Sequence, residues 1–498
     1  MTFVPRHLRP GCAAVFGALA LLAGACARPA EPAPPPLVRE APARTANIEV
    51  AFDGGADTTT VRWCFDGRPP SLRLRTRRQA RATVAITDDR GHDLRTPRGD
   101  RLDPPTPLAG CLVHVLETAP LVRERDGAGG DVLLAVHDMF LRPHPLPVET
   151  HVRFRTKENL YVTTAWPRTR DGHGFHPAPS VHRFPSYVAV GPRPPRTIRL
   201  SGGTLRVRST GGAPGETAPA VTALAEDAAA SLVAVYGTMP RSTLALFLRP
   251  SRWGGSVGFG QLVRGGGAAV VLHVSPDASP SALVGTWTAT HEFMHAAMPF
   301  ADDPWLGEGI ASYFTEVART RRGHRTEAEG WAALDAAFER GRRRGRGLSL
   351  EATSRSMHAL FAYQRVYWAG AAVCFLLDVE IRRRTANREG LDDALHTLTD
   401  LLDAPRTIPW HEIVGRFESR YGPGLTDLVR THLRRRSFPD VEPAYAFLGI
   451  RRRDGTIHLD DTAEGAQIRR SIMAPREGPR AMASGSDPAE SGRTPSPP

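Results

Sequence analysis

The sequence predicts an α+β protein in which an all-β, sandwich-like region over residues 46–184 precedes a mixed sheet and helix region over residues 185–474. In the first region, short alternating runs of apolar and polar residues are separated by Gly, Pro and Asp clusters, as strands are by turns. In the second region a few strands are followed by helical segments from Ser281 to about Leu433. The 498 residues, 41% of them hydrophobic, suffice for two or three domains.

Five runs of the first region are predicted to be strands because apolar side chains alternate along them. They are Thr59–Phe65, Ala82–Thr87, Cys111–Leu116, Asp131–His137 and His151–Thr156. Two of these runs contain a cysteine, Cys64 and Cys111. In an oxidising compartment the two could pair, and otherwise they are buried thiols, so the sequence leaves both states open.

The second region begins with predicted strands at Thr197–Ser209, Thr243–Leu248 and Ala268–Val274, and with an Ala-rich helix at Pro219–Tyr236. The glycine-rich run from Gly254 to Gly267 fits neither a P-loop nor a dinucleotide-binding turn, so we interpret it as a hairpin loop. Residues 443–473 are expected to be a small terminal piece of the same domain. The Pro- and Ser-rich tail over residues 475–498 is expected to be disordered.

The N-terminus is typical of an export signal over residues 1–25. Arg6 and Arg9 precede the apolar stretch Ala13–Ala25, which is shorter than a membrane-spanning helix. The sequence Leu-Ala-Gly-Ala-Cys ending at Cys26 is similar to a lipobox, and a Pro-rich tether over residues 26–45 follows. We expect an extracytoplasmic lipoprotein anchored to the membrane through Cys26, with cleavage after Ala25 and free secretion as the alternative.

The net charge of +12 raises the possibility of a nucleic-acid-binding protein. Arginine supplies nearly all of the positive charge, and the arginines form scattered clusters, not one stripe with interleaved aromatic residues. The clusters are Arg342–Arg344, Arg382–Arg384, Arg434–Arg436 and Arg451–Arg453. We therefore expect solvated faces and no nucleic-acid partner, and the sequence assigns no oligomeric state.

A metal site is predicted by the run His291-Glu292-Phe293-Met294-His295. Ser279 followed by Pro280 is typical of a helix start, and on this helix the two histidines lie one turn apart on one face. Both imidazoles can then reach one ion, while Glu292 projects beside them and can accept a proton from a bound water. Two surface or capping histidines are the alternative interpretation of so short a pattern.

A second helix supplies the third ligand in this prediction. Asp303 and Pro304 are typical of another helix start, and a turn over residues 298–303 would bring the new helix back antiparallel to the first. Glu308 would then face the two histidines and complete a His₂Glu set, which leaves one position of a Zn²⁺ ion open for water. Glu316, two turns further along, is the alternative ligand, but we expect it to support the ligands from behind or to face solvent.

These residues resemble a known family. HEFMH followed by PWLGEGIASYF is similar to the gluzincin pattern H-E-x-x-H … W-L-x-E-G-x-A-x-Y, and the runs that begin at Val366, Phe375 and Gly390 resemble the glycyl aminopeptidase family. The resemblance covers residues 185–440 and implies a thermolysin-like (gluzincin) catalytic domain. It also implies that Tyr367, in the Y-x-x-G motif, donates a hydrogen bond to the oxyanion of the intermediate; packing on an apolar helix is the alternative role.

The sequence also departs from this family. Its aminopeptidases hold the substrate's amine with a carboxylate in a glycine-rich strand, whereas residues 258–274 contain neither Asp nor Glu. We therefore expect a zinc metallopeptidase that acts on peptides or proteins outside the cytoplasm, with exo- or endopeptidase specificity open and internal cleavage favoured. The alternative is a membrane-anchored binding lipoprotein that uses an inactive peptidase fold.

Overall fold

The computed structural model describes residues 44–476, with gaps at 53–55, 96–100, 103–109, 126–129, 157–159, 216, 252–254 and 346. The predicted signal peptide, Cys26 and all but the ends of the predicted tether and tail lie outside the described residues. None of the helices within the described part of the chain combines the length and the hydropathy of a bilayer-spanning segment.

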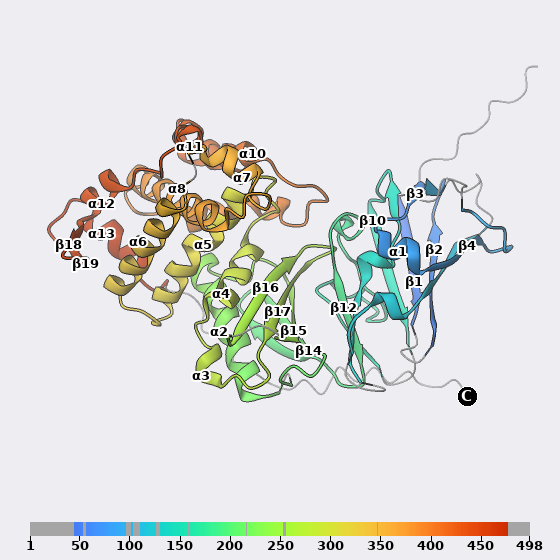
Figure 1. The fold of residues 1–498 in the computed structure, drawn as a ribbon. Coiled ribbons are helices and arrows are strands. Elements are labelled where there is room, and N and C mark those ends of the chain that lie inside the picture. The colour runs from blue at the N-terminus through green and yellow to red at the C-terminus, as the bar shows by residue number, and fades with distance from the viewer. Residues whose placement is uncertain are drawn as a thin grey trace, which may run out of the picture. The chain divides into compact units, whose positions relative to one another are not determined.

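Two packed β-sheets form most of the N-terminal region, as predicted (Figure 1). The first has the order β10-β1-β2-β6-β4, and its strands are Glu149–Arg155, Thr45–Ala51, Thr58–Phe65, Leu112–Glu117 and Thr83–Asp88. The second has the order β11-β12-β8-β7, and its strands are Tyr161–Thr163, Tyr187–Gly191, Val132–Ala135 and Val122–Arg125. Smaller elements are β3 (Ser71–Arg73), β5 (Arg101–Leu102), β9 (Arg142–His144), α1 (Arg77–Ala82) and the 3₁₀ turns Ala119–Leu121, Val136–Asp138 and Pro179–His182.

The alternating pattern of these strands places one set of side chains between the sheets. Ile48 and Val50 of β1 and Trp63 of β2 are buried with Val188 and Val190 of β12 in one hydrophobic cluster. Because side chains alternate between the two faces of a strand, the intervening residues face outward. This arrangement confirms the predicted sandwich.

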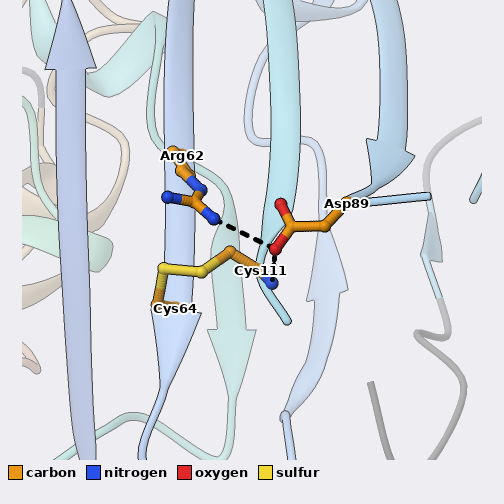
Figure 2. Close-up of a disulfide and its surroundings, with 4 residues drawn as sticks. All are labelled: Arg62, Cys64, Asp89 and Cys111. Carbon is orange, nitrogen blue, oxygen red and sulfur yellow. Dashed lines mark hydrogen bonds and ion pairs between the residues drawn. A yellow bond between two sulfur atoms is a disulfide. The ribbon is translucent and has the colours of Figure 1, made fainter. Parts of the chain in front are cut away.

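The structure contains a disulfide between Cys64 and Cys111, which resolves the question that the sequence left open (Figure 2). Trp63 of β2 pairs with Leu112 of β6 in the antiparallel register. The next residues, Cys64 and Cys111, therefore lie opposite each other. The carboxylate of Asp89 accepts hydrogen bonds from the Cys111 backbone N–H at 2.8 Å and from the Arg62 guanidinium at 3.0 Å. The bond closes a segment of 47 residues and so restricts the unfolded chain.

A five-stranded mixed sheet with the order β13-β14-β15-β17-β16 opens the second region (Figure 1). Its strands are Arg196–Leu200, Gly203–Ser209, Thr243–Pro250, Ala268–Val274 and Val257–Val263. Strands β14, β15 and β17 are parallel, with α2 (Pro219–Tyr236) as the connection between β14 and β15, and the edge strand β16 runs antiparallel to β17. One face of this sheet buries apolar side chains against the N-terminal region.

Helices complete the second region. They are α3 (Pro280–Leu283), α4 (Trp287–Met294), α5 (Pro304–Arg321), α6 (Glu327–Arg343), α7 (Leu350–Arg355), α8 (Tyr363–Arg384), α9 (Leu391–Ala394), α10 (Trp410–Tyr421), α11 (Leu425–Arg434), α12 (Glu442–Leu448) and α13 (Ala466–Met473). The 3₁₀ turns His295–Ala297 and Leu395–Leu401 and the hairpin of β18 (Ile450–Arg453) and β19 (Thr456–Leu459) belong to the same region. The helices share one hydrophobic core with α2 and the sheet.

Three local predictions were wrong in detail. The predicted strand over residues 197–209 is a hairpin of β13 and β14, turned at Gly202, which has a φ of +83°. The glycine-rich run includes the strand β16, so its hairpin loop covers only residues 264–267. Ser279 does cap a helix, but this helix ends at Leu283. His291 lies on a separate helix that begins at Trp287, and His295 opens the 3₁₀ turn that continues it.

Candidate active site

The first two candidate ligands lie at the end of α4, which follows a sharp break in the chain. Gly285 has a φ of +66°, which favours glycine, and its N–H donates to the carboxylate of Asp227 at 2.8 Å. The new helix then places His291 and His295 one turn apart, with ring centroids 4.8 Å from each other. Both side chains therefore face the same space.

Helix α5 places the third candidate ligand, Glu308, opposite the two rings. Its Oε2 lies 3.1 Å from Nε2 of His291 and 3.5 Å from Nε2 of His295. The ligand atoms of these three residues all lie within 4.8 Å of one another, and they form the one such group of His, Cys, Asp or Glu among the residues that the structure describes. The structure thus brings together the three residues that the sequence singled out.

Close packing of α5 against α8 sets the position of Glu308. A Cβ on Gly309 would stand 2.5 Å from the backbone carbonyl carbon of Gly370, so the two helices meet backbone to backbone. Further along α5, the hydroxyl of Tyr313 donates to the buried carboxylate of Asp378 on α8 at 2.7 Å. These two contacts hold α5, which carries Glu308, against α8, which carries Tyr367.

Aromatic stacking orients the ring of His291. The indole of Trp287 stacks on it with centroids 4.4 Å apart, and the ring of Tyr367 lies nearly parallel to it at 5.6 Å. Nδ1 of His291 is buried and has no hydrogen-bond partner among the described residues. The two aromatic rings, and not a hydrogen bond at Nδ1, therefore orient this imidazole.

The side chain of Glu292 extends from α4 to the edge strand β16. Burial raises the pKa of its carboxyl group to about 7, against the opposing effect of the nearby His291 and of the Leu262 backbone N–H that donates to it. A Cβ on Gly260 of β16 would stand 2.5 Å from Cγ of Glu292. The absence of a side chain at position 260 therefore makes room for the Glu292 side chain.

The charges around the site favour an ionised Glu308 and a protonated Tyr367. Burial alone would raise the pKa of Glu308, but the proximity of His295 and hydrogen bonds from both imidazoles lower it below its ordinary value. Burial and the charge of Glu308 raise the pKa of Tyr367, whose hydroxyl is hydrogen-bonded to the Glu308 carboxylate. Tyr367 therefore keeps its proton and can act as a hydrogen-bond donor.

The alternative ligand Glu316 lies elsewhere and is not part of the group of candidate ligands. Its carboxylate accepts a hydrogen bond from Nε1 of Trp287 at 3.1 Å and forms ion pairs with Arg319 and Arg325. Glu316 thus supports the indole that stacks on His291. The i, i+4 spacing of Trp287 and His291 is a signal in the sequence that points to this stacking.

Arg264, just beyond β16, is a site residue that the sequence gave no reason to select. Its guanidinium is buried, donates to the backbone carbonyl of His295 at 3.1 Å and lies over the ring of Phe300. Burial lowers its pKa to about 9, while the charges of Glu292 and Glu308 act in the opposite direction. A cation thus lies near Glu292, at the end of a glycine-rich strand that contains no carboxylate.

No protein-family model and no curated protein matches the sequence. Among solved structures, an aminopeptidase N family protein from Idiomarina loihiensis is similar at 13% identity, with a TM-score of 0.59 over 81% of this chain and 78% of that one. An M1 zinc metallopeptidase from Deinococcus radiodurans matches at 14% identity, with a TM-score of 0.48 over 80% of this chain and 94% of that one. The chain therefore has the fold of the aminopeptidase N family protein, a β-rich N-terminal region followed by a mixed sheet and a helical region, in agreement with the fold that its motifs imply.

Proposed function

We propose that this chain is a zinc-dependent peptidase. The observation that carries the proposal is the convergence of His291, His295 and Glu308, whose ligand atoms lie within 4.8 Å of one another, with Glu292 beside them. Two imidazoles and one carboxylate are a typical ligand set of catalytic zinc, because they leave one position open. The donor set therefore fits this ion.

A zinc ion held by these three residues supplies Lewis-acid activation of water and of the substrate carbonyl. Glu292 accepts the proton of the attacking water on its carboxylate and delivers it to the leaving amine. Its pKa of about 7 suits both transfers, since the group can gain and lose a proton near neutral pH. The hydroxyl of Tyr367 donates a hydrogen bond to the oxygen of the scissile carbonyl as negative charge develops there.

We place this activity outside the cytoplasm, on a lipoprotein anchored through Cys26. The Cys64–Cys111 disulfide supports an oxidising compartment. The cation Arg264 beside Glu292, and the lack of Asp and Glu over residues 258–274, support internal cleavage over removal of N-terminal residues, since a free amine has no carboxylate partner in that strand.

Metal analysis combined with two variants tests the proposal. The wild type should bind one equivalent of zinc and cleave members of a peptide library. Glu308→Ala should lose zinc, whereas Glu292→Gln should keep zinc and lose hydrolysis; Asp427→Ala, which removes an exposed carboxylate on α11, should change neither. A wild-type protein that binds no zinc would contradict the proposal and favour a binding lipoprotein.

A further inference from the structure

A basic cavity lies where the end of α6 meets the start of α8, one helical turn from Tyr367. It has a volume of about 530 Å³ and is lined by Arg340, Arg343, Arg344 and Gln364. The three arginines are exposed, and no carboxylate lines the cavity. The cavity is therefore open to solvent and positively charged.

The cavity offers hydrogen-bond donors and almost no acceptors. Nε1 of Trp368 donates to Oε1 of Gln364 at 3.0 Å, which leaves the amide NH₂ of Gln364 to donate to a ligand. Guanidinium groups only donate, and they match the two oxygens of a carboxylate in geometry. The chemistry that fits this lining is an anion with acceptor oxygens.

The carboxylates nearest to the cavity already have partners. Asp335 and Glu339 line a neighbouring pocket together with Arg340 and Arg343, and they pair with Arg452 at 2.6 Å and with Arg342, respectively. Within the described residues, no ion pair joins a lining arginine of the cavity to a carboxylate. The dipole of α6 places partial negative charge at its C-terminus, which offsets only a part of the charge of three guanidinium groups. The cavity therefore keeps a net positive charge that favours binding of an anion from outside the chain.

Aromatic rings connect this cavity to the candidate active site. Cζ of Arg340 lies 5.3 Å from the ring centre of Trp368. The ring centres of Trp368 and Trp287 are 5.9 Å apart, and those of Trp287 and His291 are 4.4 Å apart. Trp368 is buried, so this series of contacts bounds the distance between the cavity and His291 and is not itself a path for a peptide. Four or five residues of extended peptide, at about 3.3 Å each, cover that distance. A Cβ on Gly341 would stand 2.7 Å from Cβ of Trp368, so close helix packing holds the cavity in place.

We propose that this arginine cavity binds a carboxylate of the peptide substrate, so that the enzyme prefers acidic peptides. The carboxylate belongs to an Asp or Glu side chain, or to the C-terminus of the peptide, about four or five residues from the scissile bond. This inference rests on the proposed peptidase function and names the substrate class of the same site.

Three peptides with a common cleavable core test the inference. One carries Glu five residues from the scissile bond on each side and an amidated C-terminus, the second has Gln at both positions, and the third is the Gln peptide with a free C-terminal carboxylate at the same distance. They are compared on the zinc-loaded wild type, on a variant with Arg340→Gln, Arg343→Gln and Arg344→Gln, and on a control with Arg77→Gln, Arg78→Gln and Arg81→Gln. The control removes three exposed arginines from α1, so the change in net charge is matched.

The wild type should show a kcat/KM about tenfold higher for the Glu peptide than for the amidated Gln peptide, mainly through KM, and the cavity variant should lose this ratio while the control keeps it. If only the third peptide has a higher kcat/KM than the amidated Gln peptide, the carboxylate that the cavity binds is the C-terminus of the substrate. Equal cleavage of all three peptides by the wild type, or an unchanged ratio in the cavity variant, would overturn the inference. Fluorescence anisotropy of labelled Glu peptide with Glu292→Gln protein separates the two proposals, because carboxylate binding is then measured without hydrolysis.

Discussion

Gly260 lies directly against Glu292, since a Cβ at position 260 would stand 2.5 Å from Cγ of the glutamate. The two residues belong to the edge strand β16 and to α4, so this contact joins the sheet to the helix that carries the candidate ligands. Leu262 on the same strand donates its backbone N–H to the Glu292 carboxylate. The strand thus both makes room for the proposed base and orients it.

Gly260→Ala should therefore displace Glu292 and lower kcat about 10²-fold while zinc binding is retained, since a misplacement of about 1 Å has an effect of this size. Steady-state kinetics and zinc analysis on the same preparation check this expectation. Gly307→Ala is the control, because a Cβ at position 307 would meet nothing within 4 Å. Full activity of Gly260→Ala would show that the contact does not position Glu292.

Removal of the Tyr367 hydroxyl tests its proposed role at the oxyanion. Tyr367→Phe keeps the ring that lies parallel to His291 and loses only the donor. We expect kcat to fall by about 10²–10³, the usual effect of the loss of one such donor. If the variant binds zinc and retains the wild-type kcat, Tyr367 only packs against the imidazole.

The charge of Arg264 should shift the acidic limb of the pH–rate profile, whose position depends mainly on the burial of Glu292. Glu292 must be ionised to accept a proton, so kcat/KM should decline as the pH falls through the pKa of this carboxyl group in the zinc-loaded enzyme. Arg264 lowers this pKa, and Arg264→Gln should therefore move the decline to higher pH, whereas Arg264→Lys, which keeps the positive charge, should move it less. Identical profiles for the wild type and the Gln variant would contradict this coupling.

The crossing of α5 and α8 should tolerate no side chain at Gly370, because a Cβ there would collide with the backbone carbonyl oxygen of Trp305. We expect Gly370→Ala to lower the free energy of unfolding by about 1–3 kcal/mol, as overpacking of a well-packed core does. Gly415→Ala on α10, where a Cβ meets nothing within 4 Å, should instead raise it by up to about 1 kcal/mol. Urea denaturation of both variants measures the two changes.

Acid should destabilise the N-terminal region through its buried histidines. Burial lowers the pKa of His182 to about 3, against 6.5 for an exposed imidazole. Between these values the unfolded chain binds a proton that the folded chain does not, so stability falls with decreasing pH by up to about 1.4 kcal/mol per pH unit for this group. Above pH 6.5 the group is neutral in both states and has no such effect.

Urea denaturation at pH 7 and pH 5.5 measures this loss for the wild type and for His182→Gln, which cannot titrate. The variant should lose less stability than the wild type over the same interval. His114 adds a similar contribution, since burial also lowers its pKa to about 3. An equal loss in both proteins would show that His182 takes up its proton in the folded state as well.

Short-range patterns in the sequence determined the fold class and the three candidate metal ligands. The spacing of His291 and His295 is a local property of a helix, and the Asp303-Pro304 start followed by Glu308 needs only a short turn to bring the carboxylate back to the imidazoles. Alternation of apolar residues likewise depends on neighbouring positions alone, which is why the sandwich was predicted. The break between α3 and α4 was missed because it depends on a hydrogen bond from Gly285 to Asp227, far away in the chain.

Tertiary structure alone decided which distant residues surround these ligands. It placed Gly260 and Arg264 beside Glu292, directed Glu316 to Trp287 and gathered arginines of α6 next to Gln364 of α8. It also set Cys64 opposite Cys111, because strand register determines whether two thiols can bond. Each of these contacts joins segments whose approach depends on how sheets and helices pack, and no local pattern of residues encodes that packing.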